Sequence, residues 1–354
     1  MRYYTITVTN PDSGAVYAQW TSYINGVTDL GALDIQFDIL VPDQAIPSSN
    51  FMVIIFGIPL QLISQAFNFN GMNITISAGF KKGLPLANPA QAGVIAQGNI
   101  VQAFGNWIGV DMTLNFMCNP GLAGTATAAT AQGNILPTAQ QAKAQSPASP
   151  PPTGTLDSPM NGSFLWPKGS DLSDVLKNFF ATALPNFKLA ISINPNLKAP
   201  NVQAGVYPTL RAFAGWLLGY TKSLIGGSYP GVSLRIDSGN TIVVDDGTSV
   251  GQTTNIAFQE LIGQPTWIAP LQIQFKCPMR SDIKVNDNIV LPKGIFPSIS
   301  PISNPETPNN YRDQSAQQGT FKVIEVHHFG RFRQATADSW ATLITCAFIP
   351  NTSA

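Results

Sequence analysis

The chain has 354 residues, which is enough for two or three domains with hydrophobic cores of their own. Its formal net charge is zero and only 11% of its residues are charged, against roughly 25% in an average globular protein. This balance excludes a basic protein that grips nucleic acid through phosphate contacts, and it predicts a surface largely covered by other subunits.

The sequence predicts neither export nor stable membrane association. Tyr3–Val8 alternates like a strand and leaves no room for the apolar core of a signal peptide. The longest apolar stretch, Phe51–Ile63, is too short to span a bilayer. Three widely spaced cysteines, Cys118, Cys277 and Cys346, suit buried free thiols in a reducing compartment, not a disulfide framework or a zinc site.

Residues 1–118 are predicted to form a first β-barrel domain. Its clearest strand alternates apolar with polar residues, and the apolar positions are Leu33, Ile35, Phe37 and Ile39. Phe51–Phe56 is continuously apolar, which predicts a strand buried on both faces. Pro59–Phe67 predicts a short helix with one apolar side, made of Leu60, Ile63 and Phe67. Another strand begins at Ile74.

A strand pair occurs twice, once near each end of the chain. The first copy is 98–104 followed by 110–116, and the second is 319–326 followed by 341–346. Both alternate with a period of two, and a tryptophan precedes the second strand in each, Trp107 and then Trp340. We interpret the match as duplication of one β module, which is typical of assembly proteins; a chance likeness of pattern is the alternative.

Residues 119–160 change in composition to Ala, Thr, Gln, Ser, Gly and Pro. Such a segment cannot bury enough apolar surface to fold alone, so it is either a flexible linker or an arm ordered against a neighbouring subunit.

Residues 161–254 predict a small β-α-β-α-β-β domain. A strand at Phe164–Trp166 precedes a helix with Ser170 as its N-cap. The apolar face of this helix follows the helical period and consists of Leu172, Val175, Leu176, Phe179 and Phe180. A strand at 187–193, a second helix from about Pro208 and a hairpin across 238–240 complete the domain.

Residues 255–354 are predicted to form a second β-barrel domain. The expected strands are 256–261, 271–276, 289–291, 321–326 and 341–348, and a long loop rich in Pro, Ser, Asn and Gln covers 295–318. The fold class is therefore mainly β, with two related β-barrels and one α+β insertion.

Four patterns could carry chemistry, and each has a simpler explanation. Residues 247–251 match Gly-x-Ser-x-Gly, but a hairpin strand precedes them and no helix follows. His327 and His328 are adjacent on a strand, so they point to opposite faces and cannot chelate one ion. Asp245-Asp246 lacks the spaced carboxylates of a calcium loop, and Asp34 with Asp38 is typical of an exposed polar stripe. We expect no catalytic residues, metal or cofactor.

The C-terminal motifs resemble those of a known family. Gly263-Gln264-Pro265 precedes a strand and a turn at 273–289, then come 319–330, with the pattern G-x-y-x-V-x-x-V-x-H-x-G, and Trp340-Ala341-Thr342. In this order they resemble the terminal barrel of baseplate hub proteins of contractile-tailed bacteriophages. Residues 77–80, 83–89 and 98–101 are similar to the first barrel of the Mu-like and myovirus hubs. Asn286 replaces the usual glycine, and Asn tolerates the left-handed conformation.

The resemblance implies a structural virion protein in the tail baseplate, assembled in the host cytoplasm. Family members form a homotrimer whose two barrels per chain give a ring of near six-fold shape. That ring joins the six-fold tail tube, or its initiator, to a three-fold central spike, contacts other baseplate proteins and lets DNA pass in transit.

Candidate interface residues are Leu33, Ile35, Phe37, Ile39, Trp107 and Trp340, together with the segments 119–160 and 295–318. Two alternatives come from other classes. A receptor- or glycan-binding tail module would need aromatic residues clustered on one loop, and a cell-wall hydrolase would need a buried acid in a cleft.

Overall fold

The computed structural model describes residues 1–41, 50–82, 88–120, 159–185, 187–227, 229–237, 241–247, 251–292, 302–303 and 320–348. Several predicted features lie outside this part of the chain. They are most of the segment 119–160, most of the loop 295–318, the turn at 238–240 and Ser249 of the Gly-x-Ser-x-Gly pattern.

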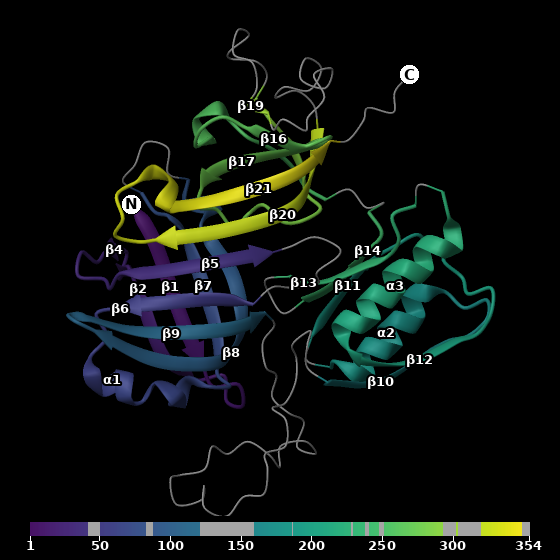
Figure 1. The fold of residues 1–354 in the computed structure, drawn as a ribbon, viewed down its shortest axis with the longest axis horizontal. Coiled ribbons are helices and arrows are strands. Elements are labelled where there is room, and N and C mark those ends of the chain that lie inside the picture. The colour runs from purple at the N-terminus through teal and green to yellow at the C-terminus, as the bar shows by residue number, and fades with distance from the viewer. Residues whose placement is uncertain are drawn as a thin grey trace, which may run out of the picture.

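Strands dominate the described residues, and most of them join one continuous 14-stranded sheet (Figure 1). Two helices of more than ten residues lie in a separate α+β unit (Figure 1). The prediction of a mainly β fold with an α+β insertion is confirmed.

The first β unit comprises β1 to β9. Its strands are β1 (Arg2–Thr9), β2 (Val16–Thr21), β3 (Tyr23–Ile24), β4 (Val27–Thr28), β5 (Ile35–Val41), β6 (Phe51–Phe56), β7 (Asn73–Phe80), β8 (Gly93–Ile108) and β9 (Asp111–Pro120). Its helical turns are α1 (Leu60–Ser64), η1 (Ala66–Phe69) and η2 (Pro89–Gln91).

Two predictions for this unit are wrong in detail. β6 is buried on one face only, through Phe51, Val53 and Ile55, while Met52 on the other face is 40% exposed. That face lies on the solvent side of the sheet. In α1 and η1, Leu60 and Phe67 are exposed. A continuous apolar run does not reveal which face another layer covers, because that is decided by the sheet as a whole.

The second β unit comprises β15 to β21. Its elements are β15 (Thr253–Asn255), η3 (Phe258–Glu260), β16 (Thr266–Ala269), β17 (Gln272–Pro278), β18 (Asn288–Val290), β19 (Ile302–Ser303), β20 (Thr320–Arg331), η4 (Ala337–Ser339) and β21 (Trp340–Phe348). The strand predicted at 256–261 is instead a 3-10 turn, and β15 and β16 were not predicted. Asn286 has a φ of 78°, so this asparagine adopts the left-handed turn as expected.

Strand order repeats between the two β units. Neighbouring strands run β5-β6-β9-β8-β7 in the first unit and β16-β17-β21-β20 in the second, with β18 also paired to β20. These ladders are antiparallel in both units. The topology therefore supports duplication of a module. The two tryptophans do not match, however: Trp107 belongs to β8, before the turn, and Trp340 begins β21.

The α+β unit comprises β10 (Pro159–Trp166), α2 (Leu172–Ala183), β11 (Lys188–Ser192), β12 (Gln203–Thr209), α3 (Leu210–Ile225), β13 (Ser233–Asp237) and β14 (Thr241–Asp245). Its N-cap on α2 is Asp171, not Ser170, whose hydroxyl donates to the Pro167 carbonyl at 2.7 Å. The strand β12, which pairs with β10, was not predicted because Gly205 and Pro208 disguise its period. The order is thus β-α-β-β-α-β-β.

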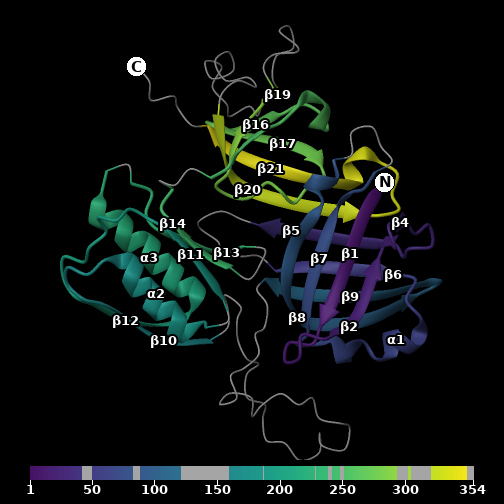
Figure 2. The same ribbon diagram turned by 180° about the vertical axis from the view of Figure 1, so that it is seen from behind.

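Three hydrophobic clusters fill the three units. The cluster of the first β unit also contains Met279 and Trp340 from the second. The two β units therefore share apolar packing, whereas the α+β unit has a core of its own and lies to one side of them (Figures 1 and 2).

Candidate assembly interface

The two β units join where β5 pairs with β20. The antiparallel ladder runs from Val326 opposite Val41 to Arg331 opposite Gln36. This ladder, which we call the seam, makes the two sheets continuous (Figure 1). The arrangement closes the outer edge of β5 inside the chain and removes a site for unwanted strand pairing.

Polar side chains reinforce the seam on its solvent face. His327 Nε2 lies 2.6 Å from Asp38 Oδ1, and Arg331 Nε donates to Gln36 Oε1 at 3.0 Å. The backbone N–H of Arg333 donates to Asp34 Oδ1 at 2.9 Å. Asp34 and Asp38 thus contact the second β unit separately and do not form a paired carboxylate site.

His328 points the other way, into the core. Its Nδ1 lies 3.0 Å from Thr342 Oγ1, and burial lowers the pKa of its imidazole to about 3, with His327 adding a smaller effect. The two adjacent histidines therefore lie on opposite faces of β20, as the strand period predicts.

Trp340 and Arg2 make contacts that link the first β unit to the second. Trp340 is fully buried, its Nε1 donates to the Gly79 carbonyl at 3.0 Å, and its ring centroid lies 5.2 Å from that of Phe37. The Arg2 guanidinium donates to carbonyls of the 331–336 turn, including that of Thr336 at 2.8 Å. These contacts come from residues far apart in sequence, so the seam is a tertiary feature.

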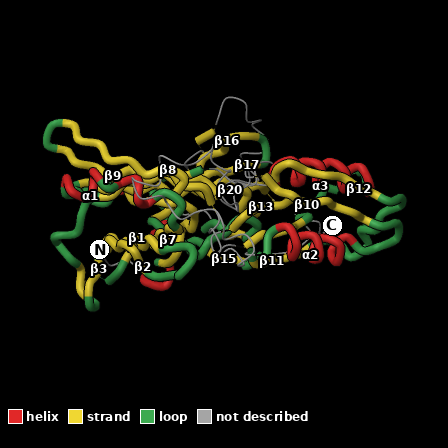
Figure 3. Tube along the Cα trace, turned by 90° about the horizontal axis from the view of Figure 1, so that it is seen from below, coloured by secondary structure: helices red, strands yellow, loops and turns green. Residues whose placement is uncertain are grey.

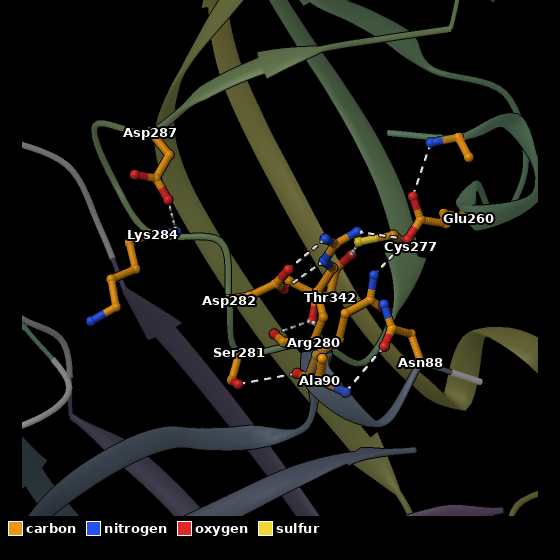
Figure 4. A network of polar contacts seen from close by, with 12 residues as sticks. Asn88, Ala90, Glu260, Cys277, Arg280, Ser281, Asp282, Lys284, Asp287 and Thr342 are labelled. Carbon is orange, nitrogen blue, oxygen red and sulfur yellow. Dashed lines mark hydrogen bonds and ion pairs between the residues drawn. The ribbon is translucent and has the colours of Figure 1, made fainter. Parts of the chain in front are cut away.

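A buried arginine organises the second contact between the units (Figure 4). Arg280 binds both carboxylate oxygens of Asp282 at 2.7 Å and lies 3.3 Å from Glu260 Oε1. Gln91 of the first unit donates to the same Glu260 oxygen at 2.5 Å, and its carbonyl accepts from the Ser281 N–H at 2.8 Å. Burial alone would lower the pKa of Arg280, but the carboxylates outweigh it and raise that pKa.

All three cysteines are buried free thiols. Burial raises the pKa of Cys277 to about 12, and it also raises the pKa values of Cys118 and Cys346. A thiol with a raised pKa is a poor nucleophile at neutral pH, so these side chains act as packing groups.

Exposed apolar side chains gather at the tip of the β8–β9 hairpin, which extends beyond the body of the molecule (Figure 3). Trp107, Ile108 and Val110 are 61%, 69% and 93% exposed. Of the charged residue types, this tip carries only Asp111. Clustered exposed apolar side chains mark a surface for another molecule.

The six residues predicted for the interface divide into two groups. Ile35, Phe37, Ile39 and Trp340 are buried in the chain's own core, and Leu33 packs half-buried against it. Their side chains are occupied within the chain because the seam is internal. Trp107 is exposed, so the interface prediction is carried forward with this residue alone.

The other patterns show structural roles where they are described. Asp246 is buried, and it accepts from the Asn194 N–H at 2.6 Å and the Tyr229 hydroxyl at 3.0 Å. Within the described ranges, no group of three His, Cys, Asp or Glu residues could hold a metal ion. In the same part of the chain, no helix is long and apolar enough to cross a membrane.

Solved structures resemble the chain over nearly its whole length. A tail protein from Neisseria meningitidis aligns with a TM-score of 0.50 and 10% identity over 97% of this chain and 96% of that one. A 43 kDa prophage tail protein from Shewanella oneidensis aligns at 0.49 and 8% identity over 98% and 97%. No protein-family model and no curated sequence matches. The predicted likeness to phage tail proteins is thus confirmed as a likeness of fold.

Proposed function

We propose that this chain is a structural component of a phage-type tail, a baseplate hub that acts as a homotrimer. The observation that carries the proposal is the pair of related β units joined edge to edge in one chain. Three such chains place six β units around a ring, which lets a three-fold assembly meet a six-fold one. The whole-chain likeness to a tail protein of known structure supports the same role.

In this proposal the partners are the tail tube or its initiator on one side and the central spike on the other, with other baseplate proteins around the ring. The chain acts in the virion after assembly in the host cytoplasm, and its lumen passes DNA in transit. A net charge of zero suits a conduit that must not retain a polyanion.

The described residues support a structural role and offer no catalytic constellation. Their buried acids Asp245, Asp246 and Asp287 accept hydrogen bonds from backbone N–H groups, and their thiols have raised pKa values. Within the described part, the buried histidine bonds to a threonine hydroxyl and not to a nucleophile–acid pair.

The mass of the purified chain in solution tests the proposal. One chain weighs 37.8 kDa, and light scattering on a sizing column should give a mass near three chains. Negative-stain images of that species should show a ring with six similar lobes. A strictly monomeric chain at micromolar concentration, or a trimer without a central opening, contradicts the hub.

A further inference from the structure

The α+β unit is joined to the β units differently from the way the β units are joined to each other. The β units share a strand ladder and an apolar cluster that includes Met279 and Trp340. Among the described residues, the apolar cluster of the α+β unit belongs to that unit alone, and its strands form sheets of their own. The unit lies at one end of the molecule (Figures 2 and 3). Units that share little apolar packing are expected to move relative to one another.

Polar contacts link the α+β unit to the second β unit, and we call this contact region the joint. Arg235 of β13 is buried, and its guanidinium donates to the Val285 carbonyl at 3.3 Å. Lys322 of β20 donates through Nζ to the Gly247 carbonyl at 3.0 Å, just beyond the end of β14. Figures 1 and 2 show β13 on the side of the unit that faces the β units. The joint therefore holds the unit where the chain leaves it.

The loop that accepts from Arg235 also contains a buried polar group that opposes the contact. Asn286 follows Val285 and is buried, and within the described part of the chain its Nδ2 has no hydrogen-bond partner. A buried donor left unpaired costs a free energy of the same order as that gained from a hydrogen bond to a charged group. The gain at Arg235 and the cost at Asn286 therefore offset each other, and the unit is held only weakly.

We propose that the α+β unit is an arm that moves as a rigid body on the β units, between the docked orientation described above and undocked ones. Lys322 and Gly247 mark the pivot, and the hydrogen bond from Arg235 to the Val285 carbonyl is the latch. Undocking lets water reach both the guanidinium and the Asn286 amide, so the unpaired donor gains a partner. The inference goes beyond the proposed function and applies to a single chain as well as to a trimer.

In the proposed hub, the joint separates two structural tasks. The β units are fixed by the seam and keep the geometry of the ring. The α+β unit lies outside the continuous sheet, so a protein that binds one of its orientations better than the others sets that orientation.

Distances between spin labels, measured by pulsed electron paramagnetic resonance, test the motion. The native cysteines are buried, so nitroxides attach at engineered cysteines on exposed positions. Asp12→Cys with Lys177→Cys spans the joint. Asp12→Cys with Asp338→Cys spans the seam, and Lys177→Cys with Lys222→Cys lies within the α+β unit. Labelled chains are diluted with unlabelled ones before assembly, so that a trimer carries one labelled pair.

The pair across the joint should give a broad distance distribution with more than one maximum, and both control pairs should give narrow ones. The pair across the seam is the matched control for motion between units, because it also joins two units of the chain. The pair within the α+β unit shows whether that unit moves as a rigid body.

Three variants then shift or retain the balance between orientations. Arg235→Met keeps the length of the side chain and removes the latch, so it should raise the ratio of undocked to docked chains about tenfold. Asn286→Gly deletes the unpaired amide, and glycine accepts the φ of 78°, so the ratio should fall by roughly fivefold. Lys198→Met removes an exposed cation of the same unit, which pairs with Asp171 at 3.5 Å, and should leave the ratio unchanged.

A narrow distribution across the joint, unchanged in Arg235→Met, overturns the arm whatever the mass of the particle. The distributions of the parent chain decide the question even where a variant does not fold. The hub is tested separately by light scattering. A trimer with a fixed joint keeps the hub and excludes the arm, and a monomer with a moving joint does the reverse.

Discussion

The matching edges of β20 and β8 have the same strand geometry and opposite surroundings. The edge of β20 is bonded to β5 and backed by the buried Trp340, while the edge of β8 carries the exposed Trp107. The corresponding strand edge of the module therefore pairs with another strand in one copy and carries an exposed tryptophan in the other. The β20 edge is closed within the chain by β5, whereas no strand among the described residues pairs with the β8 edge beyond Asn99.

The largest expected effect contrasts the two tryptophans. Trp340→Ala should lower the free energy of unfolding by about 3–5 kcal/mol, because it empties a fully buried site and removes the bond to Gly79. Trp107→Ala should change it by less than about 0.5 kcal/mol in a monomeric chain, since the indole is 61% exposed. Urea denaturation measures both, and equal losses would contradict the assignment of core and surface.

The second-largest loss of stability should come from disrupting the contacts of Arg280. Arg280→Met keeps the length of the side chain but deprives Asp282 and Glu260 of their charged partner. We expect a loss of roughly 1.5–3 kcal/mol, the range for hydrogen bonds to charged groups. Lys177→Met, which removes an exposed helix ion pair with Asp174, is the control and should cost no more than about 0.5 kcal/mol. Similar urea midpoints for the two variants would contradict a structural role for Arg280.

Close packing at the seam gives the third prediction. Gly330→Ala drives a methyl group into Phe37 and Trp340, and overpacking of this kind costs about 1–3 kcal/mol. Gly215→Ala is the matched control, because nothing lies within 4 Å of its added Cβ in α3 and alanine favours a helix. Thermal denaturation should move the two midpoints in opposite directions, and a stabilised Gly330→Ala variant would show that the seam is loosely packed.

The fourth prediction concerns pH, where the expected effect is spread over several pH units. The folded-state pKa of His328 is about 3, well below the usual 6.5, so only the unfolded chain binds this proton between those values. The contribution of the buried, neutral His328 imidazole to the free energy of unfolding is therefore complete above pH 6.5. It declines as pH falls towards 3, by roughly 1 kcal/mol per pH unit.

Urea denaturation between pH 4 and pH 7 measures this slope. His328→Gln should flatten it, whereas His327→Gln keeps the buried imidazole and should retain it. An unchanged slope in His328→Gln would assign the acid sensitivity to other groups.

The sequence predicted several elements well, and the misses have physical causes. Period-two alternation located β5 and β20, and the helical period located the buried face of α2. β12 was missed because glycine and proline weaken the strand signal, and Asp171 replaced Ser170 as N-cap because the serine hydroxyl turns back to Pro167. A sequence pattern does not show which of several nearby groups a backbone or side-chain atom will bond to.

The sequence by itself determined which residues alternate and where the composition changes, and it predicted that one strand pair occurs twice. Only the tertiary structure decided which copy is closed and which is open. The reason is that a strand's edge bonds to whichever strand lies beside it, and β5 and β20 are separated by almost the whole chain. For the same reason, Phe37 and Trp340 became core and Trp107 became surface, although all three occur in similar apolar strand patterns.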